Sequence, residues 1–449
     1  MYVLFFSFFR IFARMEKMRN IFLFAAVLLI CGAIAFFCYS KPIEEEAEAE
    51  AEVEYYNPFQ DECDSIMGYP TSWLGAYIVD LKTGKPLYSK NADSLFRPAS
   101  TTKMLTAACV LVDNDSNQCF KTKVDISGEI VNNALNGDLI VVSSTDPLLG
   151  TQSYKKINGA EFIDSIVAKI KSLGISQIAG AIRVDASQYK EWGVPKGWQG
   201  NDTVSTYGTP YRSFNYRSNL VYNKKQKAER VNYAPDSLLI QDLKHALADK
   251  GIYVLNNLDK PTENKRTTIY THNSLRFADM LALMTKYSDN LVAEGFLRAL
   301  SPKAEQREDA LSKERRILRK LDVPMPDSLA VFDGSGLSRL TKLSPKYLAA
   351  LLTARAKTKY AKTYLRLPPR VGIEGTVHSL LKNTPLAGRL RLKTGSLNDV
   401  QCYAGYAFMD DNSPTTPTHV IVIYGNFFPM TRAEFVKKVS NMLLHIFEQ

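Results

Sequence analysis

A serine and a lysine three residues apart, Ser100 and Lys103, form a pair whose chemistry depends on their spacing. They precede an apolar run, Leu105 to Val112, that predicts a buried helix. Because three residues make nearly one helical turn, the amine of Lys103 can lie beside the hydroxyl of Ser100. A serine hydroxyl becomes an effective nucleophile when a neighbouring base takes its proton, and a desolvated lysine can be that base. The pair indicates nucleophilic catalysis, with an ordinary helix start as the alternative for the pair taken alone.

Two further short motifs follow this pair in a fixed order. Ser288 and Asn290 form a serine-x-asparagine motif, and Lys393 to Gly395 form a lysine-threonine-glycine motif. The three motifs in this order are the signature of penicillin-binding proteins and serine β-lactamases. A second lysine-threonine-glycine, Lys82 to Gly84, precedes the serine and lies between two strand-like segments, so it predicts only a hairpin turn.

Residues 1–40 predict an export segment, either a signal peptide or a retained membrane anchor. An uncharged apolar run from Ile21 to Phe37 follows four basic residues and precedes a glutamate-rich tract. The basic residues hold the start of the chain on the cytoplasmic side, so we expect the remainder to be exported to the periplasm. The alternatives left open are lipid attachment at Cys31 or Cys38 and a translation start at Met15 or Met18.

Residues 41–60 alternate glutamate with alanine and have no apolar face, which predicts a solvated acidic linker. The chain carries a formal net charge of +10, and the part beyond the linker is more basic because residues 44–54 contain seven glutamates. That charge either attracts an acidic substrate such as the cell-wall polymer or has no functional meaning. Aromatic residues do not interleave with the basic ones in a nucleic-acid-binding pattern, so we expect no nucleic-acid partner.

The four cysteines beyond the leader and the five histidines have no metal-ligand spacing, so we expect no metal and no cofactor. The cysteines are predicted to be mostly buried thiols. A disulfide between Cys109 and Cys119 is the alternative in an oxidising compartment.

With 449 residues, 45% of them hydrophobic, the chain is long enough for two or three domains. Two early and three late strand-like segments predict one antiparallel sheet whose halves come from opposite ends of the chain. Between the halves, residues 121–232 change to short strands around a helix and predict an inserted α/β domain, which leaves 61–120 and 233–449 as the catalytic domain. The predicted strands are Trp73 to Val79, Pro86 to Ser89, Leu390 to Leu392, Gln401 to Phe408 and His419 to Tyr424; the predicted helices include Asp236 to Lys250, Leu275 to Thr285, Ala304 to Leu321, Ser344 to Ala356 and Arg432 to Phe447.

The region from about Trp73 to the carboxyl end resembles the D-alanyl-D-alanine carboxypeptidases of peptidase family S13, the class C low-molecular-mass penicillin-binding proteins. The resemblance implies an α+β fold of the serine β-lactamase/DD-transpeptidase type, with a five-stranded antiparallel sheet flanked by helices. Family members usually carry two inserted domains, but the stretch 101–287 is short enough that we expect one here. Besides the three motifs, the match includes Asn136 to Leu139, Thr145 to Pro147, Gly197-Trp198, Asn201-Asp202, Asp333 to Ser338 and Gly375-Thr376.

The resemblance also implies a role for each residue of the first two motifs. Ser100 attacks the carbonyl between two D-alanines, and Lys103 takes its proton. Ser288 relays a proton to the leaving amine, and Asn290 holds the substrate amide. The structural alternative for Ser288 and Asn290 is helix capping.

The third motif is implied to bind the carboxylate end of the substrate. Lys393 and Thr394 face that carboxylate, and Gly395 leaves the edge strand unobstructed. The backbone N–H groups of Ser100 and Ser396 form the oxyanion hole. The structural alternative for Lys393 is a solvated strand lysine.

Asp202 matches the family position that contacts the free amino group of the diaminopimelate side chain, with an ordinary turn residue as the alternative. The expected activity is a serine-type D-alanyl-D-alanine carboxypeptidase, with or without endopeptidase activity. The expected partners are peptidoglycan stem peptides ending in D-Ala-D-Ala, β-lactam antibiotics, and the membrane through the amino-terminal segment. A β-lactamase, or a penicillin-binding or wall-binding protein without turnover, is the alternative.

Overall fold

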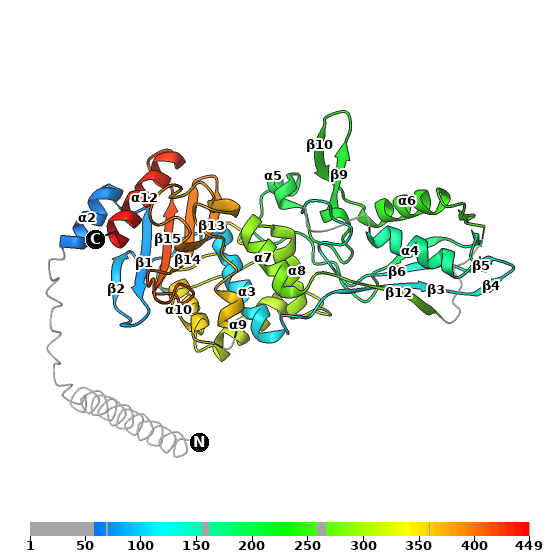
Figure 1. The fold of residues 1–449 in the computed structure, drawn as a ribbon, viewed down its shortest axis with the longest axis horizontal. Helices are drawn as coiled ribbons and strands as arrows, with labels where there is room; N and C mark the ends of the chain where they lie inside the picture. The colour runs from blue at the N-terminus through cyan, green and yellow to red at the C-terminus, as the bar shows by residue number, and fades with distance from the viewer. Residues whose placement is uncertain (1–57, 69–70, 155–160, 258–265, 359, 449) are drawn as a thin grey trace, which may run out of the picture. The chain divides into compact units, whose positions relative to one another are not determined.

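The computed structural model describes residues 58–448 except 69–70, 155–160, 258–265 and 359 (Figure 1). The predicted export segment and most of the predicted acidic linker lie outside these residues. The linker prediction is wrong at its end, because Pro58 begins helix α2 (Pro58–Met67). Cys63 and Met67 of this helix are buried in an apolar cluster, which explains why it forms. Among the described residues, no helix combines the length and apolar character needed to cross a membrane.

A five-stranded antiparallel sheet joins the two ends of the described chain, and this confirms the predicted fold class (Figure 1). The strand order is β13-β14-β15-β1-β2, so that the strand carrying Lys393 lies at an edge. Strands β1 and β2 form the predicted hairpin, with the second lysine-threonine-glycine in its turn. The strands are β1 Leu74–Asp80, β2 Pro86–Lys90, β13 Leu390–Leu397, β14 Val400–Ala407 and β15 His419–Asn426.

Alternating side chains of the sheet supply two separate apolar clusters. In β15, Val420 and Val422 belong to one cluster, whereas Ile421 and Ile423 belong to the other. This two-residue period is what a strand buried on both faces requires. The first cluster receives α3 Thr102–Asp113, α7 Phe277–Tyr287, α8 Asn290–Leu300, α9 Arg307–Lys320, α10 Pro345–Ala356 and α11 Ala361–Tyr364; the second receives α2 and α12 Arg432–Phe447.

The inserted region extends further along the chain than predicted. Strand β12 (Thr267–Asn273) pairs with β3 (Lys121–Ile126), and helix α6 (Pro235–Ala248) packs against α4 (Glu161–Ser172). Leu239, Leu243 and Leu247 of α6 share one apolar cluster with α4 and β3. The boundary at 232 is therefore wrong, because burial of α6 and pairing of β12 keep the chain in the insertion until it returns at α7.

The remaining strands of the insertion are short and belong to two four-stranded sheets and one hairpin, and three short helices lie between β8 and β9 in the chain. They are β4 Glu129–Val131, β5 Ala134–Asn136, β6 Leu139–Val142, β7 Gln177–Ile178, β8 Ile182–Asp185, β9 Leu220–Asn223, β10 Ala228–Val231, β11 Tyr253–Val254, α5 Gly200–Thr203, and the 3₁₀ helices η2 Thr206–Gly208 and η3 Arg217–Asn219.

All four cysteines in the described residues are free thiols, so the alternative disulfide between Cys109 and Cys119 is not formed. Cys63, Cys109 and Cys402 are buried, and Cys119 is partly exposed. Within the described part of the chain, no group of three or more histidine, cysteine or acidic residues is placed to hold a metal ion.

Candidate active site

Ser100 and Lys103 lie at the start of the helix that crosses the middle of the catalytic part. Ser100 belongs to the 3₁₀ turn η1 (Ala99–Thr101), which leads directly into α3. The Nζ of Lys103 lies 2.9 Å from the Oγ of Ser100. Ala99 has a φ of +46°, a conformation that costs energy for a residue with a side chain and is found at functional sites. The strained turn holds Ser100 at the end of the helix, where it lines a cleft.

The amine of Lys103 has no exposed surface and contacts three oxygens. Besides Ser100, it donates to Asn290 Oδ1 at 2.5 Å and to the backbone carbonyl of Ser335 at 2.8 Å. Burial lowers the pKa of Lys103 to about 8, because desolvation disfavours the charged amine. A substantial fraction of the amine is therefore neutral near pH 8 and can accept a proton from Ser100. Three carboxylates oppose this shift of the pKa, those of Asp333, Asp289 and Glu294.

The second motif forms the turn between α7 and α8. Ser288 ends α7 in the left-handed conformation, with a φ of +61°. Asp289 caps α8 by accepting the N–H of Val292, and Asn290 is the first helical residue. The capping alternative is met in part, because Ser288 is the C-cap residue of α7 through its backbone N–H, which donates to the carbonyl of Met284. Capping uses neither the hydroxyl of Ser288 nor the side chain of Asn290. Both of those side chains are left to face Lys103, Lys393 and the cleft.

Lys393 comes to the same place from the edge strand β13. Its Nζ donates to Ser288 Oγ at 2.9 Å and to the carbonyl of Thr394 at 2.6 Å. The side chain is fully buried, so it is not the solvated strand lysine of the alternative. Burial and the positive charge of Lys103 hold the pKa of Lys393 well below its usual range. The site therefore contains two serine–lysine pairs in one cleft.

Gly395 lets strand β13 approach the backbone next to the nucleophile. A Cβ added at Gly395 would lie 2.5 Å from the carbonyl oxygen of Pro98 and 3.1 Å from the backbone nitrogen of Ser100. On either side, Thr394 Oγ1 donates to Thr376 at 2.8 Å and Ser396 Oγ donates to Gln401 Oε1 at 2.8 Å. The edge strand thus lies against the Ser100 turn. The oxyanion-hole role of Ser100 and Ser396 stays a prediction.

These residues line one cleft of about 640 Å³. Its lining includes hydroxyls, amides, the Asp202 carboxylate and the guanidinium groups of Arg339 and Arg432. The predicted site residues in the lining are Ser100, Asp202, Ser288, Asn290, Thr394 and Ser396, while Lys103 and Lys393 lie buried directly behind it.

The sequence profile of the D-Ala-D-Ala carboxypeptidase 3 (S13) family matches residues 63–232 and 221–427, which together span most of the chain. The chain belongs to this family. S13 is a family of serine peptidases, and the serine–lysine geometry fits that class of enzyme.

Similar proteins carry names that agree with S13 membership. The D-alanyl-D-alanine carboxypeptidase DacB of Haemophilus influenzae is 25% identical over 385 residues, which cover 70% of this chain and 78% of that protein. The carboxypeptidase DacB of Mycolicibacterium smegmatis is 26% identical over 347 residues, covering 73% and 72%. The crystal structure of penicillin binding protein 4 from Haemophilus influenzae superposes with a TM-score of 0.70 at 21% identity, over 83% of this chain and 96% of that one. The structural likeness shows the shared fold.

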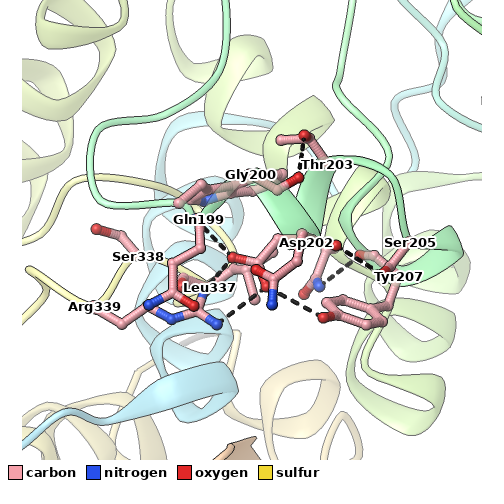
Figure 2. A network of polar contacts seen from close by, with 12 residues as sticks. Gln199, Gly200, Asp202, Thr203, Ser205, Tyr207, Leu337, Ser338 and Arg339 are labelled. Carbon is pink, nitrogen blue, oxygen red and sulfur yellow. Dashed lines mark hydrogen bonds and ion pairs between the residues drawn. The ribbon is translucent and has the colours of Figure 1, made fainter.

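In this S13 protein, Asp202 has partners that the sequence did not predict (Figure 2). Its carboxylate has no exposed surface and forms a two-point ion pair with Arg339, in which Nη2 lies 3.0 Å from Oδ1. It also accepts the N–H of Gln199 at 2.8 Å and the hydroxyl of Tyr207 at 3.2 Å. Its charge is therefore already compensated inside the protein. This arrangement differs from the free counter-charge expected for a substrate amine.

Four further residues take part in the S13 site without having been predicted to do so. The backbone carbonyl of Tyr207 accepts a hydrogen bond from the side-chain amide of Asn290 at 2.8 Å, and the backbone carbonyl of Ser335 accepts one from Lys103. Arg339 follows the Asp333 to Ser338 run, and Thr376 belongs to Gly375-Thr376 in η4 (Gly375–Val377). Both runs were noted as family matches, so that signal could have identified Arg339 and Thr376. Tyr207 and Ser335 act here through backbone carbonyls, which every residue has, so the residue type gives no signal.

Proposed function

We propose that this protein is a serine-type D-Ala-D-Ala carboxypeptidase that acts on peptidoglycan stem peptides through an acyl-serine intermediate. The observation that carries the proposal is the 2.9 Å contact between Ser100 Oγ and the buried amine of Lys103. It lies at the cleft that the second serine–lysine pair also faces. The D-alanyl-D-alanine carboxypeptidase named among its relatives supports the substrate class.

The proposed reaction begins with attack of Ser100 Oγ on the carbonyl carbon between the two terminal D-alanines. Lys103 takes the hydroxyl proton, and the backbone N–H groups of Ser100 and Ser396 hold the oxyanion. The C–N bond then breaks, the proton taken by Lys103 passes through Ser288 to the amine of the leaving D-alanine, and the peptide remains esterified to Ser100. Water hydrolyses the ester and restores the free serine. Throughout, Asn290 holds the substrate amide.

The buried amine of Lys393 and the hydroxyl of Thr394 are proposed to bind the terminal carboxylate of the substrate, whose negative charge favours the protonated form of that amine. The same groups would receive the carboxylate of a β-lactam, which acylates Ser100 in the same way. The Haemophilus influenzae penicillin binding protein 4 has also been crystallised with a β-lactam, which supports this part of the proposal.

The test is to incubate purified protein with two wall fragments, a pentapeptide monomer and a cross-linked dimer. The proposal predicts that free D-alanine is released from the pentapeptide and that the Ser100→Ala variant releases none. Cleavage of the dimer to monomers would add DD-endopeptidase activity at the same serine. Acylation by penicillin without release of D-alanine would make it a non-turnover binding protein, and rapid penicillin hydrolysis would make it a β-lactamase. Either of the last two results would overturn the proposal.

We also propose that the catalytic part is exported to the periplasm, with the apolar run Ile21 to Phe37 as a signal peptide or anchor. The support is the order of basic, apolar and acidic segments at the amino terminus. Protease added to spheroplasts should digest the region after Glu54. A catalytic part that stays protected until the cells are lysed would show that it remains inside them.

A further inference from the structure

One peptide bond connects Lys103 to a buried carboxylate. The carbonyl of Ser335 accepts the Lys103 amine at 2.8 Å. The N–H of the same peptide unit, that of Gly336, donates to Asp333 Oδ1 at 3.0 Å. A peptide that donates to an anion at one end and accepts from an amine at the other is polarised in the direction that favours both contacts. The charge of Asp333 thus acts on Lys103 although the two side chains do not touch.

Asp333 is held by hydrogen bonds alone. Its carboxylate has no exposed surface, and none of the described residues forms an ion pair with it. Its Oδ2 accepts from Trp198 Nε1 at 2.7 Å, from Ser335 Oγ at 2.9 Å and from the N–H of Ser338 at 2.9 Å. With the N–H of Gly336, four hydrogen-bond donors compensate the one buried carboxylate, as burial of such a group requires.

Trp198 comes from the inserted region, and its neighbours join that region to the same loop. Ser338 Oγ donates to the carbonyl of Lys196 at 2.6 Å, and the N–H of Arg339 donates to the carbonyl of Gly197 at 3.1 Å. Gly197 has a φ of +86°, and an added Cβ would lie 2.4 Å from Ser338 Oγ. The insertion therefore closes on the loop that holds Lys103, and its indole reaches Asp333.

We propose that Asp333 and Trp198 are positioning residues that hold the amine of Lys103 against Ser100 and set the pH at which this amine becomes a base. The inserted region thereby takes part in catalysis through a series of hydrogen bonds that runs from Trp198 to Asp333, through the Ser335–Gly336 peptide, and on to Lys103. This inference rests on the proposed function, because its readout is acylation of Ser100.

Other charged or titratable groups also lie near Lys103, and the variants must leave their contacts unchanged. Glu294 of α8 accepts the N–H of Ser335 at 3.1 Å and pairs with Arg307 of α9 at 2.6 Å. Asp289 caps α8, and Lys393 approaches from β13. Glu294 and Asp289 favour the charged form of the Lys103 amine, as Asp333 does.

The experiment measures the rate constant of acylation by penicillin between pH 6 and 10 for matched variants. Asp333→Asn keeps the size and removes the charge, so the rate should fall and the rising limb should move to lower pH by about one unit. Trp198→Phe keeps a six-membered aromatic ring and removes the five-membered ring with its N–H donor, so the rate should fall by about tenfold. Both proteins are compared after titration of active sites with a fluorescent penicillin.

The control is Trp192→Phe, in the other tryptophan of the inserted region. Trp192 donates to the carbonyl of Ala304 at 3.1 Å and packs against the guanidinium groups of Arg298 and Arg307. Phenylalanine keeps an aromatic face against both groups, so the variant removes the N–H donor while Arg307 stays paired with Glu294. This variant should keep the rate and the pH profile of the unaltered protein, whatever it does to thermal stability.

The comparison of the two tryptophan variants decides the inference. If Trp198→Phe lowers the rate and Trp192→Phe does not, the inference stands. If Trp198→Phe matches the unaltered protein within twofold, or both variants lose the same activity, the indole is merely structural and the inference is overturned. Should Asp333→Asn fail to fold, Trp198→Phe alone gives the answer. An unaltered protein that penicillin does not acylate would instead refute the proposed function.

Discussion

The ion pair between Asp202 and Arg339 gives a prediction whose size follows from burial. Asp202 has a fully buried side chain and that of Arg339 is 14% exposed, so removing one charge leaves the other largely out of water without its partner. Breaking such a buried pair costs about 3–5 kcal/mol in the free energy of unfolding. We therefore expect Asp202→Asn to lower this free energy by an amount in that range. The double variant with Arg339→Met should lose less than the sum of the two single variants, because no unpaired charge remains.

The assay is urea unfolding followed by tryptophan fluorescence, combined with three activity measurements. Peptides with and without the free diaminopimelate amine are compared with acylation by a simple penicillin. Because Asp202 is committed to Arg339, Asp202→Asn should reduce all three activities alike. Unchanged stability with a loss confined to the amine-bearing peptide would show that the carboxylate serves the substrate, and it would refute the structural reasoning.

Three further predictions concern the motifs themselves. The rate of acylation should rise with pH through about 8, because burial lowers the pKa of Lys103 to that value and the neutral amine is the base; a flat profile from pH 6 to 10 would exclude this role. Ser288→Ala should slow D-alanine release by roughly 100-fold, since it removes the hydroxyl that contacts the Lys393 amine, and unaltered release kinetics would rule out the proton relay. Gly395→Ala should lower the rate of acylation at least about tenfold, because the added Cβ would lie 2.5 Å from a carbonyl oxygen. The control Gly200→Ala, whose Cβ would meet nothing within 4 Å, should leave the rate unchanged. Equal rates for the two variants would contradict the close approach of β13 to the Ser100 turn.

Elements with a strong local period could be predicted from the sequence. The helix Arg432–Phe447 matches its predicted range, and the late strands β14 and β15 are largely apolar runs that are buried along almost their whole length. The three motifs were identified because their order along the chain is itself the signal. Their convergence was implied by the family resemblance, and the contacts of Lys103 and Lys393 show how it is achieved.

Contacts between segments far apart in the chain could not be predicted from the sequence. Strand β12 pairs with β3 across the whole insertion, and a strand of polar residues carries no local mark of its partner, so the boundary was placed too early. Asp202 was recognised by its position, but nothing in its neighbourhood indicates that Arg339 neutralises it. The Asp333 to Ser338 run was recognised as characteristic, yet its contact with Lys103 runs through a backbone carbonyl.

The central claim is that Ser100 is the nucleophile, and identification of the acylated residue tests it most directly. The protein is treated with penicillin, digested, and mapped by mass spectrometry, with Ser100→Ala as the control. We predict a mass increase equal to one intact drug molecule on the peptide that contains Ser100 and Lys103, and no adduct on the variant. An adduct on another peptide, or none on the unaltered protein, would contradict the account.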